Sequence, residues 1–315
     1  MNDKKYIALS GGVGGAKLVY GLTQNLAPEQ LLTVANTGDD FQHLGLHISP
    51  DLDSVMYALA GINDMDRGWG VTDESWNFLA SIKRMGGPDW FQLGDRDMAT
   101  HVLRTQYLRE ENLTAATQRL CQGLGVKYPL VPMSEQSVQT RLTTDVGNLS
   151  FQEYFVARQC EPVVSAIDFV GADQATIQPE LSHWLTDADL AGIIICPSNP
   201  YLSIDPILAI PSLVNRLRDS GVPIIAVSPI IAGKTIKGPA AKIMQEMGLE
   251  SSVLNIARHY VVNGQPLLHT LVVDVSDEMH IPEIEALGVR CVAMPTIMQY
   301  NVDKNALAKA LLSQF

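Results

Sequence analysis

The residues best suited to chemistry are glycines and aspartates near the start of the chain. The run SGGVGGAK occupies residues 10–17, and the aspartates that follow it are Asp39, Asp40, Asp51 and Asp53. A glycine-rich turn at the start of a helix lets backbone N–H groups approach a phosphate. Carboxylates beside such a turn are hard oxygen ligands, which Mg²⁺ prefers. Together these residues predict a nucleotide substrate, with Mg²⁺ as the cofactor.

The glycine run matches neither of the two common phosphate-binding motifs. Ala16 stands where the motif GxxxxGK[ST] needs glycine, and Leu18 stands where it needs Ser or Thr. The third glycine of GxGxxG is also missing. A tight turn without a ligand is the alternative. Each glycine, however, loses more conformational entropy on folding than another residue would, so four glycines in one turn suggest a function beyond turning the chain. We therefore predict nucleotide contacts from Gly11, Gly12, Gly14, Gly15 and Lys17.

Two later loops also carry polar residues directly after apolar runs. Ser198 and Asn199 follow the run at 192–196, and a loop with two lysines, Lys234 and Lys237, follows the run at 223–228. Loops at the carboxyl edge of a parallel sheet bind ligands, and a basic loop before a helix suits an anion. The alternatives are an ordinary Asn-Pro turn and a solvated lysine pair. We predict that all four residues contact the nucleotide.

The aspartates have structural as well as chemical interpretations. Asp51 or Ser49 could cap a helix, which explains one acid but not four. We therefore predict Asp39, Asp51 and Asp53 as catalytic residues, with Asp39 and Asp53 as metal ligands. Which aspartate is a ligand and which a base stays open. Asp39 also lies about twenty residues after the glycine run, where dinucleotide enzymes carry a ribose-binding acid, so a nicotinamide-dependent oxidoreductase is an alternative.

Aromatic residues and arginines gather in glycine-punctuated loops at 66–70 and 88–97. Such residues suit a flat, polar ring system. Packing of a lid, with Arg96 in an ion pair, is an equally good explanation for any single residue. The residues predicted to bind a second, acceptor substrate are Asp40, Arg67, Trp69, Trp90, Phe91 and Arg96.

The elements that position these residues alternate along the chain. Short runs rich in Val and Ile predict buried parallel strands at 6–9, 31–35, 163–169, 192–196, 223–228, 267–273 and 289–293. Helical patterns lie between them, at 207–219, 239–247, 281–287 and 304–312. This alternation predicts an α/β fold with a doubly wound, mostly parallel, Rossmann-like sheet.

Two segments depart from this alternation. Residues 54–125 contain four helical patterns, at 54–60, 74–84, 97–110 and 114–124, which predict a helical insertion that acts as a lid. Residues 137–158 alternate around Gly147 and Asn148, which predicts a β-hairpin. We expect residues 1–315 to form a single α/β nucleotide-binding domain with the insertion at 54–125 inside it.

Composition narrows the function classes. The chain has 315 residues, of which 46% are apolar and 18% charged, and a formal net charge of −12. No basic stripe is visible, so we expect no nucleic-acid partner. The four cysteines form no CxxC pair, which argues against a zinc site and a disulfide framework. No apolar run reaches the length of a membrane span, so we expect no membrane partner and a cytoplasmic location.

Taken together, the motifs resemble the 2-phospho-L-lactate transferase family, the CofD-type enzymes of coenzyme F-420 synthesis. The stretches that carry the resemblance run in one order over most of the chain: SGGVGGAK (10–17), NTGDD (36–40), SPDLDS (49–54), DRGWG (66–70), PDWFQLGDRDMATH (88–101), VGADQAT (170–176), SNP (198–200) and SPIIAGKTIKGPA (228–240). The long aromatic and acidic stretch is far more specific than the glycine run alone.

The resemblance implies a reaction. A guanosine diphosphate-linked phospho-acid would donate its phospho-acid group to the terminal ribityl hydroxyl of the deazaflavin Fo, and GMP would leave. The acid would be 2-phospholactate, phosphoenolpyruvate or 3-phosphoglycerate, and Mg²⁺ would bridge the diphosphate. A homodimer is also expected. The runner-up is a metabolic regulator of the same superfamily that binds nucleotide sugars and has no transferase activity.

Overall fold

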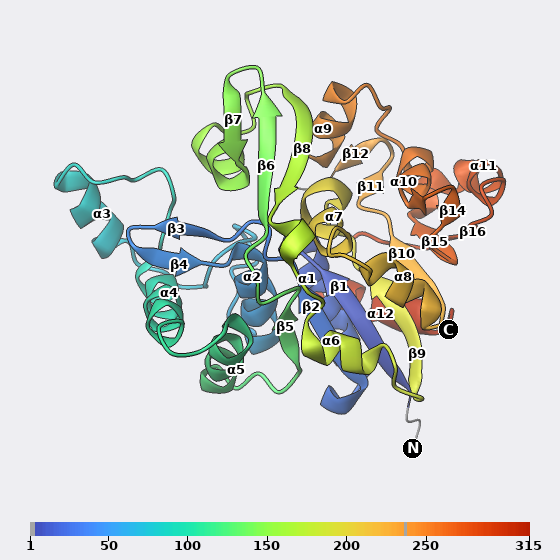
Figure 1. The fold of residues 1–315 in the computed structure, drawn as a ribbon, viewed down its shortest axis with the longest axis horizontal. Helices are drawn as coiled ribbons and strands as arrows, with labels where there is room; N and C mark the ends of the chain where they lie inside the picture. The colour runs from blue at the N-terminus through green and yellow to red at the C-terminus, as the bar shows by residue number, and fades with distance from the viewer. Residues whose placement is uncertain (1–3, 236–237) are drawn as a thin grey trace.

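The computed structural model describes residues 4–235 and 238–315. At its centre is a seven-stranded sheet in the order β16-β15-β10-β9-β1-β2-β5 (Figure 1). Its strands are β1 (Lys5–Ser10), β2 (Leu31–Ala35), β5 (Leu130–Pro132), β9 (Leu190–Ile195), β10 (Ile224–Val227), β15 (Thr270–Val273) and β16 (Arg290–Ala293). All neighbouring strands in it are parallel. The predicted α/β fold with a mostly parallel, doubly wound sheet is confirmed.

Helices cover both faces of the sheet because its central strands are apolar on both faces. Ile7 and Leu9 of β1 join one core cluster, whereas Tyr6 and Ala8 join the other. The second cluster packs against α1 (Gly12–Thr23), α2 (Pro50–Ala60), α5 (Leu113–Gly123) and α12 (Asn301–Leu312). The first packs against α6 (Pro179–Trp184), α7 (Asp205–Leu208), α8 (Leu213–Asp219), α9 (Ala240–Glu246), α10 (Val253–His259) and α11 (Ile281–Glu285).

The strand order reverses between β1 and β9. From β1 the chain proceeds outward to β2 and β5, whereas β9, β10, β15 and β16 proceed outward on the other side. Connections at such a point leave the sheet in opposite directions, which opens a crevice at the carboxyl ends of the two strands. The loops that follow β1 and β9 begin at Gly11 and Cys196. The topology therefore brings the glycine run and the Ser198-Asn199 segment to the same crevice.

A second sheet corrects two predictions. It is antiparallel, in the order β7-β6-β8, with β6 (Gln139–Thr144), β7 (Gly147–Ser150) and β8 (Val164–Val170) (Figure 1). The prediction of a buried parallel strand at 163–169 is therefore wrong, because β8 belongs to this sheet and most of its residues are partly or fully exposed. The run reads Val-Ser-Ala-Ile-Asp-Phe-Val, and its polar residues fit a half-exposed strand better than a buried one.

The predicted hairpin exists, but its second arm is shorter than expected. Thr144 pairs with Gly147, so the turn lies at 145–146 rather than at Gly147 and Asn148. The chain after β7 is helical and contains a π-helical turn at Glu153–Ala157. The Glu153 carboxylate accepts hydrogen bonds from the Ser150 N–H at 2.8 Å and from its Oγ at 2.7 Å. This local cap competes with strand pairing and ends the hairpin at Ser150.

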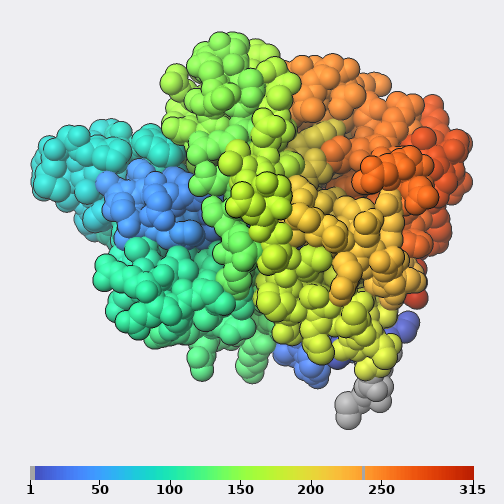
Figure 2. Space-filling view, viewed as in Figure 1, coloured from blue at the N-terminus to red at the C-terminus, as the bar shows by residue number. Residues whose placement is uncertain are grey.

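The predicted helical region contains α2, α3 (Asn77–Arg84), α4 (Asp95–Tyr107) and α5. The short hairpin of β3 (Phe41–His43) and β4 (Leu46–Ile48) lies beside α4. In space-filling view these teal and blue segments form a lobe to the left of the antiparallel sheet (Figure 2). Because α2 packs directly on α1, it also belongs to the main core. The division into one domain with an insertion at 54–125 stays a prediction.

The remaining elements connect the layers. The single helix predicted at 207–219 is two helices, α7 and α8, because Pro211 cannot continue α7 and Ser212 takes a left-handed conformation with φ 66°. The short elements are η1 (Pro28–Gln30), η3 (Ala172–Gln174), η4 (Pro200–Ile204), η5 (Val275–His280), β11 (Ile230–Ile231), β12 (Lys234–Thr235), β13 (Val261–Val262) and β14 (Gln265–Pro266). Within the described residues, no helix has the length and apolar character needed to cross a membrane.

Candidate functional site

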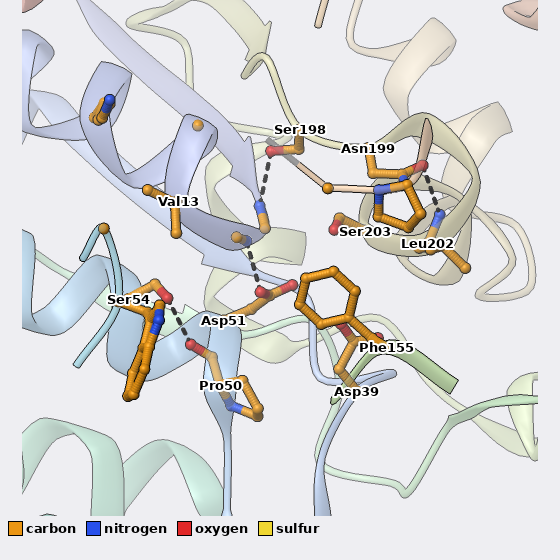
Figure 3. Close-up of a pocket in the computed structure, with 18 of the residues that line it drawn as sticks. Val13, Asp39, Pro50, Asp51, Ser54, Phe155, Ser198, Asn199, Leu202 and Ser203 are labelled. Atoms are coloured by element: carbon orange, nitrogen blue, oxygen red, sulfur yellow. Dashed lines mark hydrogen bonds between the residues drawn. The ribbon is translucent and has the colours of Figure 1, made fainter. Parts of the chain in front are cut away.

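A cavity of about 690 Å³ opens at the crevice between β1 and β9. The glycine run, the start of α2, the segment after β7 and the loop after β9 all line it (Figure 3). The 66–70 and 90–92 loops of the helical region line it as well. Its volume lies within the range of about 300–1,000 Å³ that is usual for small-molecule sites. We define this space as the central cavity.

The glycine run lets three loops approach one another closely. The Gly11 N–H donates to Ser198 Oγ at 3.0 Å, and the Gly12 N–H donates to Asp51 Oδ1 at 2.6 Å (Figure 3). A Cβ on Gly14 would lie only 2.4 Å from the carbonyl oxygen of Pro197. Packing between the loops after β1 and β9 therefore requires glycine at position 14. Gly12 needs glycine for another reason, since its φ is +61°.

Two aspartates meet at the floor of the central cavity. Asp39 and Asp51 are each only 5% exposed, and both line the cavity. Burial raises the pKa of Asp39 well above its usual range, and the neighbouring Asp51 charge raises it further. Burial also raises the pKa of Asp51, to about 6, although hydrogen bonds from Asn36 and Gly12 oppose the shift. Asp39 Oδ1 is buried and has no hydrogen-bond partner among the residues that the structure describes.

The raised pKa of Asp51 predicts a pH-dependent stability. A carboxyl group whose folded-state pKa exceeds its unfolded value stabilises the fold at low pH, and this contribution is lost as pH rises through the folded pKa. We expect the unfolding free energy of the wild type, relative to Asp51→Asn, to fall by up to about 3 kcal/mol between pH 4 and pH 7. Urea unfolding of both proteins across this range measures the difference. A difference that is independent of pH would contradict the assignment.

Asp53 lies in a different arrangement from Asp39 and Asp51. Asp53 lines the cavity, but its carboxylate pairs with Arg104 of α4, a residue with no exposed surface. Arg104 Nη1 donates to Asp53 Oδ2 at 3.0 Å, and Arg104 Nη2 contacts Asp53 Oδ1. Burial alone would lower the pKa of Arg104, but the Asp53 charge outweighs it and the pKa lies above its usual value. Both oxygens of Asp53 are therefore already paired with a cation.

The same face of α4 carries two further residues of this network. His101 Nε2 lies 3.2 Å from Asp97 Oδ1, and the Tyr57 hydroxyl donates to the same oxygen at 2.6 Å. Burial would raise the pKa of Asp97, but these contacts hold it below its usual value. Tyr57, Asp97 and His101 all line the central cavity. Sequence analysis did not identify these three residues as functional. The spacing of Asp97, His101 and Arg104, four and three residues apart, places them on one face of α4 and could have indicated the network.

The predicted acceptor-binding residues separate into two groups. Arg67, Trp69, Trp90 and Phe91 line the central cavity, whereas Asp40 and Arg96 do not. Asp40 Oδ2 accepts from Ser49 Oγ at 2.8 Å and lies 3.0 Å from His47 Nε2. Arg96 lies on an exposed surface, where its Nη1 donates to the Thr72 carbonyl at 3.2 Å. That Asp40 and Arg96 bind the acceptor stays a prediction, because neither residue lines the central cavity.

The aromatic residues of the cavity form two walls. Trp90 and Phe91 pack against Phe41 and His43, with ring centroids 4.9–5.9 Å apart. On the other wall, the Arg67 guanidinium lies 5.2 Å from the centroid of Trp69 and 4.9 Å from that of Trp76. Such walls suit a flat ring, with stacking and cation–π contacts available.

The predicted nucleotide-binding residues are also divided by the structure. Gly11, Gly12, Gly14, Lys17, Ser198 and Asn199 line the central cavity. Gly15 and Lys234 are not among its lining residues, and Lys237 lies outside the described residues. Gly15 instead packs beneath the loop, where a Cβ would lie 2.3 Å from Ser10 Oγ and 2.6 Å from Ser198 Oγ.

Two segments line the cavity that sequence analysis did not identify. One is the helical stretch after β7, which contributes Phe151, Gln152 and Phe155, and the Phe151 and Phe155 rings are stacked with centroids 5.3 Å apart. Phe155 is labelled in Figure 3. The other is 296–299, which follows β16. The first was predicted to be a strand, and the second contains no charged residue that would have drawn attention.

Comparison with protein families supports the resemblance noted from the motifs. The family model described as 2-phospho-L-lactate transferase CofD matches residues 7–297. The chain is 39% identical over 308 residues to a phosphoenolpyruvate transferase of Streptomyces griseus, covering 96% of this chain and 95% of that protein. It is 34% identical over 310 residues to a 2-phospho-L-lactate transferase of Methanosarcina mazei, covering 98% of this chain and 100% of that protein.

Solved structures show a similar fold. A protein of the UPF0052 family from Bacillus halodurans matches with a TM-score of 0.63 over 99% of each chain. A second crystal structure of a Bacillus halodurans protein matches with a TM-score of 0.61 over 98% of this chain and 99% of that chain. The sequence identities are only 15% and 14%, so these two structures support the fold alone.

Proposed function

This chain belongs to the 2-phospho-L-lactate transferase CofD family, and from that premise we propose that it transfers a phospho-acid group from a guanosine diphosphate-linked donor to the deazaflavin Fo. Membership makes the protein a transferase of phospho-acid groups in coenzyme F-420 biosynthesis. The names of the relatives favour this activity over a nucleotide-sugar-binding regulator. The proposal extends to the acceptor, the donor and the residues that serve each.

One observation carries the assignment of substrates to the site. The lining of the central cavity combines the glycine run and Ser198, the Trp90 and Phe91 wall, and the carboxylates of Asp39 and Asp51. Backbone N–H groups and the start of α1 suit a diphosphate, and the aromatic wall suits a tricyclic ring. We therefore assign the guanosine diphosphate to the loops after β1 and β9, and Fo to the helical region.

In the proposed reaction the terminal ribityl hydroxyl oxygen of Fo attacks the phosphorus of the phospho-acid. The bond from that phosphorus to the bridging oxygen breaks, and GMP leaves with the electron pair. The hydroxyl proton must pass to a base, and Asp39 has the position and the raised pKa that suit this role. The walls of the cavity hold the two reacting groups in line and exclude water, which would otherwise hydrolyse the donor.

The residues fit Mg²⁺ as the cofactor. Within residues 4–235 and 238–315, no group of three His, Cys, Asp or Glu side chains could hold a metal by itself. Mg²⁺, however, is commonly held by one or two carboxylates together with substrate phosphates, where it neutralises developing charge. Asp39 offers an unpartnered oxygen, and Asp51 raises its pKa. We favour Asp51 over Asp53 as the second ligand, because Arg104 already holds both oxygens of Asp53.

The donor acid is tested directly by product analysis. Purified protein is incubated with Fo, Mg²⁺ and one guanylylated acid at a time, made from phosphoenolpyruvate, 2-phospholactate or 3-phosphoglycerate. Mass spectrometry should show a product whose mass equals Fo plus one phospho-acid group, together with GMP. The absence of any product with all three donors would refute the proposed function. The expected homodimer and cytoplasmic location stay predictions, the first of which light scattering can check.

The assignment of Fo to the aromatic wall gives a kinetic prediction. Trp90→Ala removes a ring that lines the cavity and packs against Phe41, at a ring distance of 5.9 Å. We expect the KM for Fo to rise about 10-fold, as the loss of one aromatic contact implies, while the affinity for GDP stays unchanged. Steady-state kinetics and GDP calorimetry measure the two effects. Trp184→Ala, on the far side of the sheet, is the control for general destabilisation. A change in GDP affinity alone would place the nucleotide at this wall.

A further inference from the structure

A small chamber of about 20 Å³ adjoins the central cavity beside α1. Most of its lining residues also line the central cavity, so the two spaces border each other. We call it the side chamber. It is lined by Val13, Ala16, Lys17, Ser54, Tyr57, Ala58, Asn63, Gly68, Trp69, Gly70 and Lys304.

Lys304 is the unusual member of this set. It is 3% exposed, and its Nζ donates to Asn301 Oδ1 at 2.9 Å and to the weak acceptor Met65 Sδ at 3.4 Å. Its ammonium also lies 5.0 Å from the ring centroid of Tyr20. In the part of the chain that the structure describes, no carboxylate oxygen comes within 4.0 Å of this nitrogen. Burying a charge without a counter-charge destabilises the fold, so a buried lysine at this position suggests a functional role.

The backbone holds Lys304 firmly in this place. It lies on α12, which packs on α1 so closely that a Cβ on Gly21 would meet the Lys304 carbonyl oxygen at 2.2 Å. The same close approach would bring that Cβ to 3.2 Å from Ala308 Cβ. Packing of α12 on α1 therefore sets the position of the Lys304 backbone, and the ammonium contacts Asn301 on the same helix, Tyr20 on α1 and Met65.

A second ammonium group lies at the same chamber. Lys17 lines both the side chamber and the central cavity, and its Nζ donates to the Met298 carbonyl at 2.9 Å. Burial lowers the pKa of Lys304, and the Lys17 charge lowers it further, so the two lysines are close enough to repel. No Asp or Glu is among the lining residues of the side chamber, although the protein as a whole carries a net charge of −12. The local field therefore favours an anion.

The dimensions of the side chamber limit what it can hold. A volume of about 20 Å³ has room for one or two water-sized groups, which matches the two oxygens of a carboxylate and excludes a sugar or a base. The neighbouring lining from Val13, Ala16 and Trp69 is apolar and suits the methyl or methylene group beside such a carboxylate. Trp69 is shared with the central cavity, so a bound group could extend from one space into the other.

We propose that Lys304 and Lys17 bind the carboxylate of the donor acid, with Lys304 as the residue that distinguishes the acid-bearing donor from GDP. This inference rests on the proposed function, because it takes the donor to be a guanylylated phospho-acid. 2-Phospholactate and phosphoenolpyruvate carry a carboxylate next to the carbon that bears the phosphate ester, and in 3-phosphoglycerate one further carbon lies between the two. Because Val13, Lys17 and Ser54 line both spaces, a carboxylate held in the side chamber would bring the phosphorus into the central cavity beside the glycine run.

The test compares two ligands by calorimetry in the absence of Fo, so that no transfer takes place. Wild type, Lys304→Met and Lys309→Met are each titrated with GDP and with guanylylated 2-phospholactate. Lys309 is an exposed lysine on the same helix and serves as the matched control. We expect Lys304→Met to lower the affinity for the guanylylated acid by about 10- to 100-fold, as the loss of a charge-assisted hydrogen bond implies. GDP affinity should be unchanged, and Lys309→Met should match the wild type for both ligands.

A donor analogue keeps the test independent of the folding of the variant. Wild type is titrated with the same guanylylated acid in which an amide replaces the carboxylate, and its affinity should fall by a similar factor. The proposal would be overturned if Lys304→Met lost affinity for GDP and for the guanylylated acid by the same factor. It would also be overturned if the wild type bound the amide analogue as tightly as the guanylylated acid. Wild type that binds the donor but transfers nothing to Fo would instead refute the proposed function and leave the side chamber assignment standing.

Discussion

Asp39→Asn should lower kcat by about 10²- to 10⁴-fold, the usual contribution of a positioned acid–base group. Asp39 is a buried residue that lines the central cavity, and within residues 4–235 and 238–315 its Oδ1 has no hydrogen-bond partner. Asparagine keeps the shape but can neither accept the hydroxyl proton nor carry the charge that holds Mg²⁺. Steady-state transfer assays with saturating donor and Fo measure the change.

Stability separates this effect from misfolding. Burial and the neighbouring Asp51 raise the pKa of Asp39, so the ionised carboxylate is costly to the fold. Asp39→Asn removes that cost, and its Tm should equal or exceed that of the wild type at pH 7. Asp40→Asn is the matched control, because Asp40 is the next residue in sequence but pairs with His47 and Ser49 outside the cavity. Turnover of Asp39→Asn within a few-fold of wild type would exclude Asp39 as base and as metal ligand.

Arg104→Met should have the largest effect on stability. Arg104 is fully buried and pairs with both oxygens of Asp53, so its loss leaves a buried carboxylate without a counter-charge. Removing one partner of a buried ion pair typically costs about 3–5 kcal/mol. Methionine fills much of the same volume, which limits the contribution from an empty space. Urea unfolding at pH 7 measures the loss.

Two further variants test whether the loss comes from the ion pair. The double variant Arg104→Met with Asp53→Asn removes both charges and should regain part of the lost free energy, because contacting residues are not additive. Arg119→Met removes an exposed arginine that pairs with Glu111 and should cost about 0–1 kcal/mol. A double variant as unstable as the sum of its single variants would show that Arg104 acts through packing alone.

The two predictions concern neighbouring aspartates with opposite environments. Asp39 is buried near another carboxylate, which raises its pKa, whereas Asp53 is buried against a guanidinium that pairs with both of its oxygens. From the sequence both were predicted as metal ligands of one kind. The two aspartates differ because Arg104 of α4 forms an ion pair with Asp53, whereas no residue of α4, which the structure describes in full, forms an ion pair with Asp39.

The sequence by itself predicted the strands of the central sheet except the edge strand β5, together with several of the segments that line the site. Continuous apolar runs such as 31–35 and 192–196 allow only strands buried on both faces, and the glycine run and Ser198 must follow such strands. The motifs also identified the family, which the comparison confirms. Short-range patterns are sufficient here because each is fixed by local backbone geometry.

Only the tertiary structure decided which side chains meet. The strand at 164–170 pairs antiparallel in a second sheet rather than in the central one, because strand partners are determined by contacts distant in sequence. Asp40 and Arg96 are not among the residues that line the central cavity, and position 14 requires glycine because the Pro197 carbonyl lies against it. The pairing of Asp53 with Arg104 and the chamber shared by Lys17 and Lys304 join residues far apart in the chain. Charge and burial at these positions depend on packing, which no local pattern records.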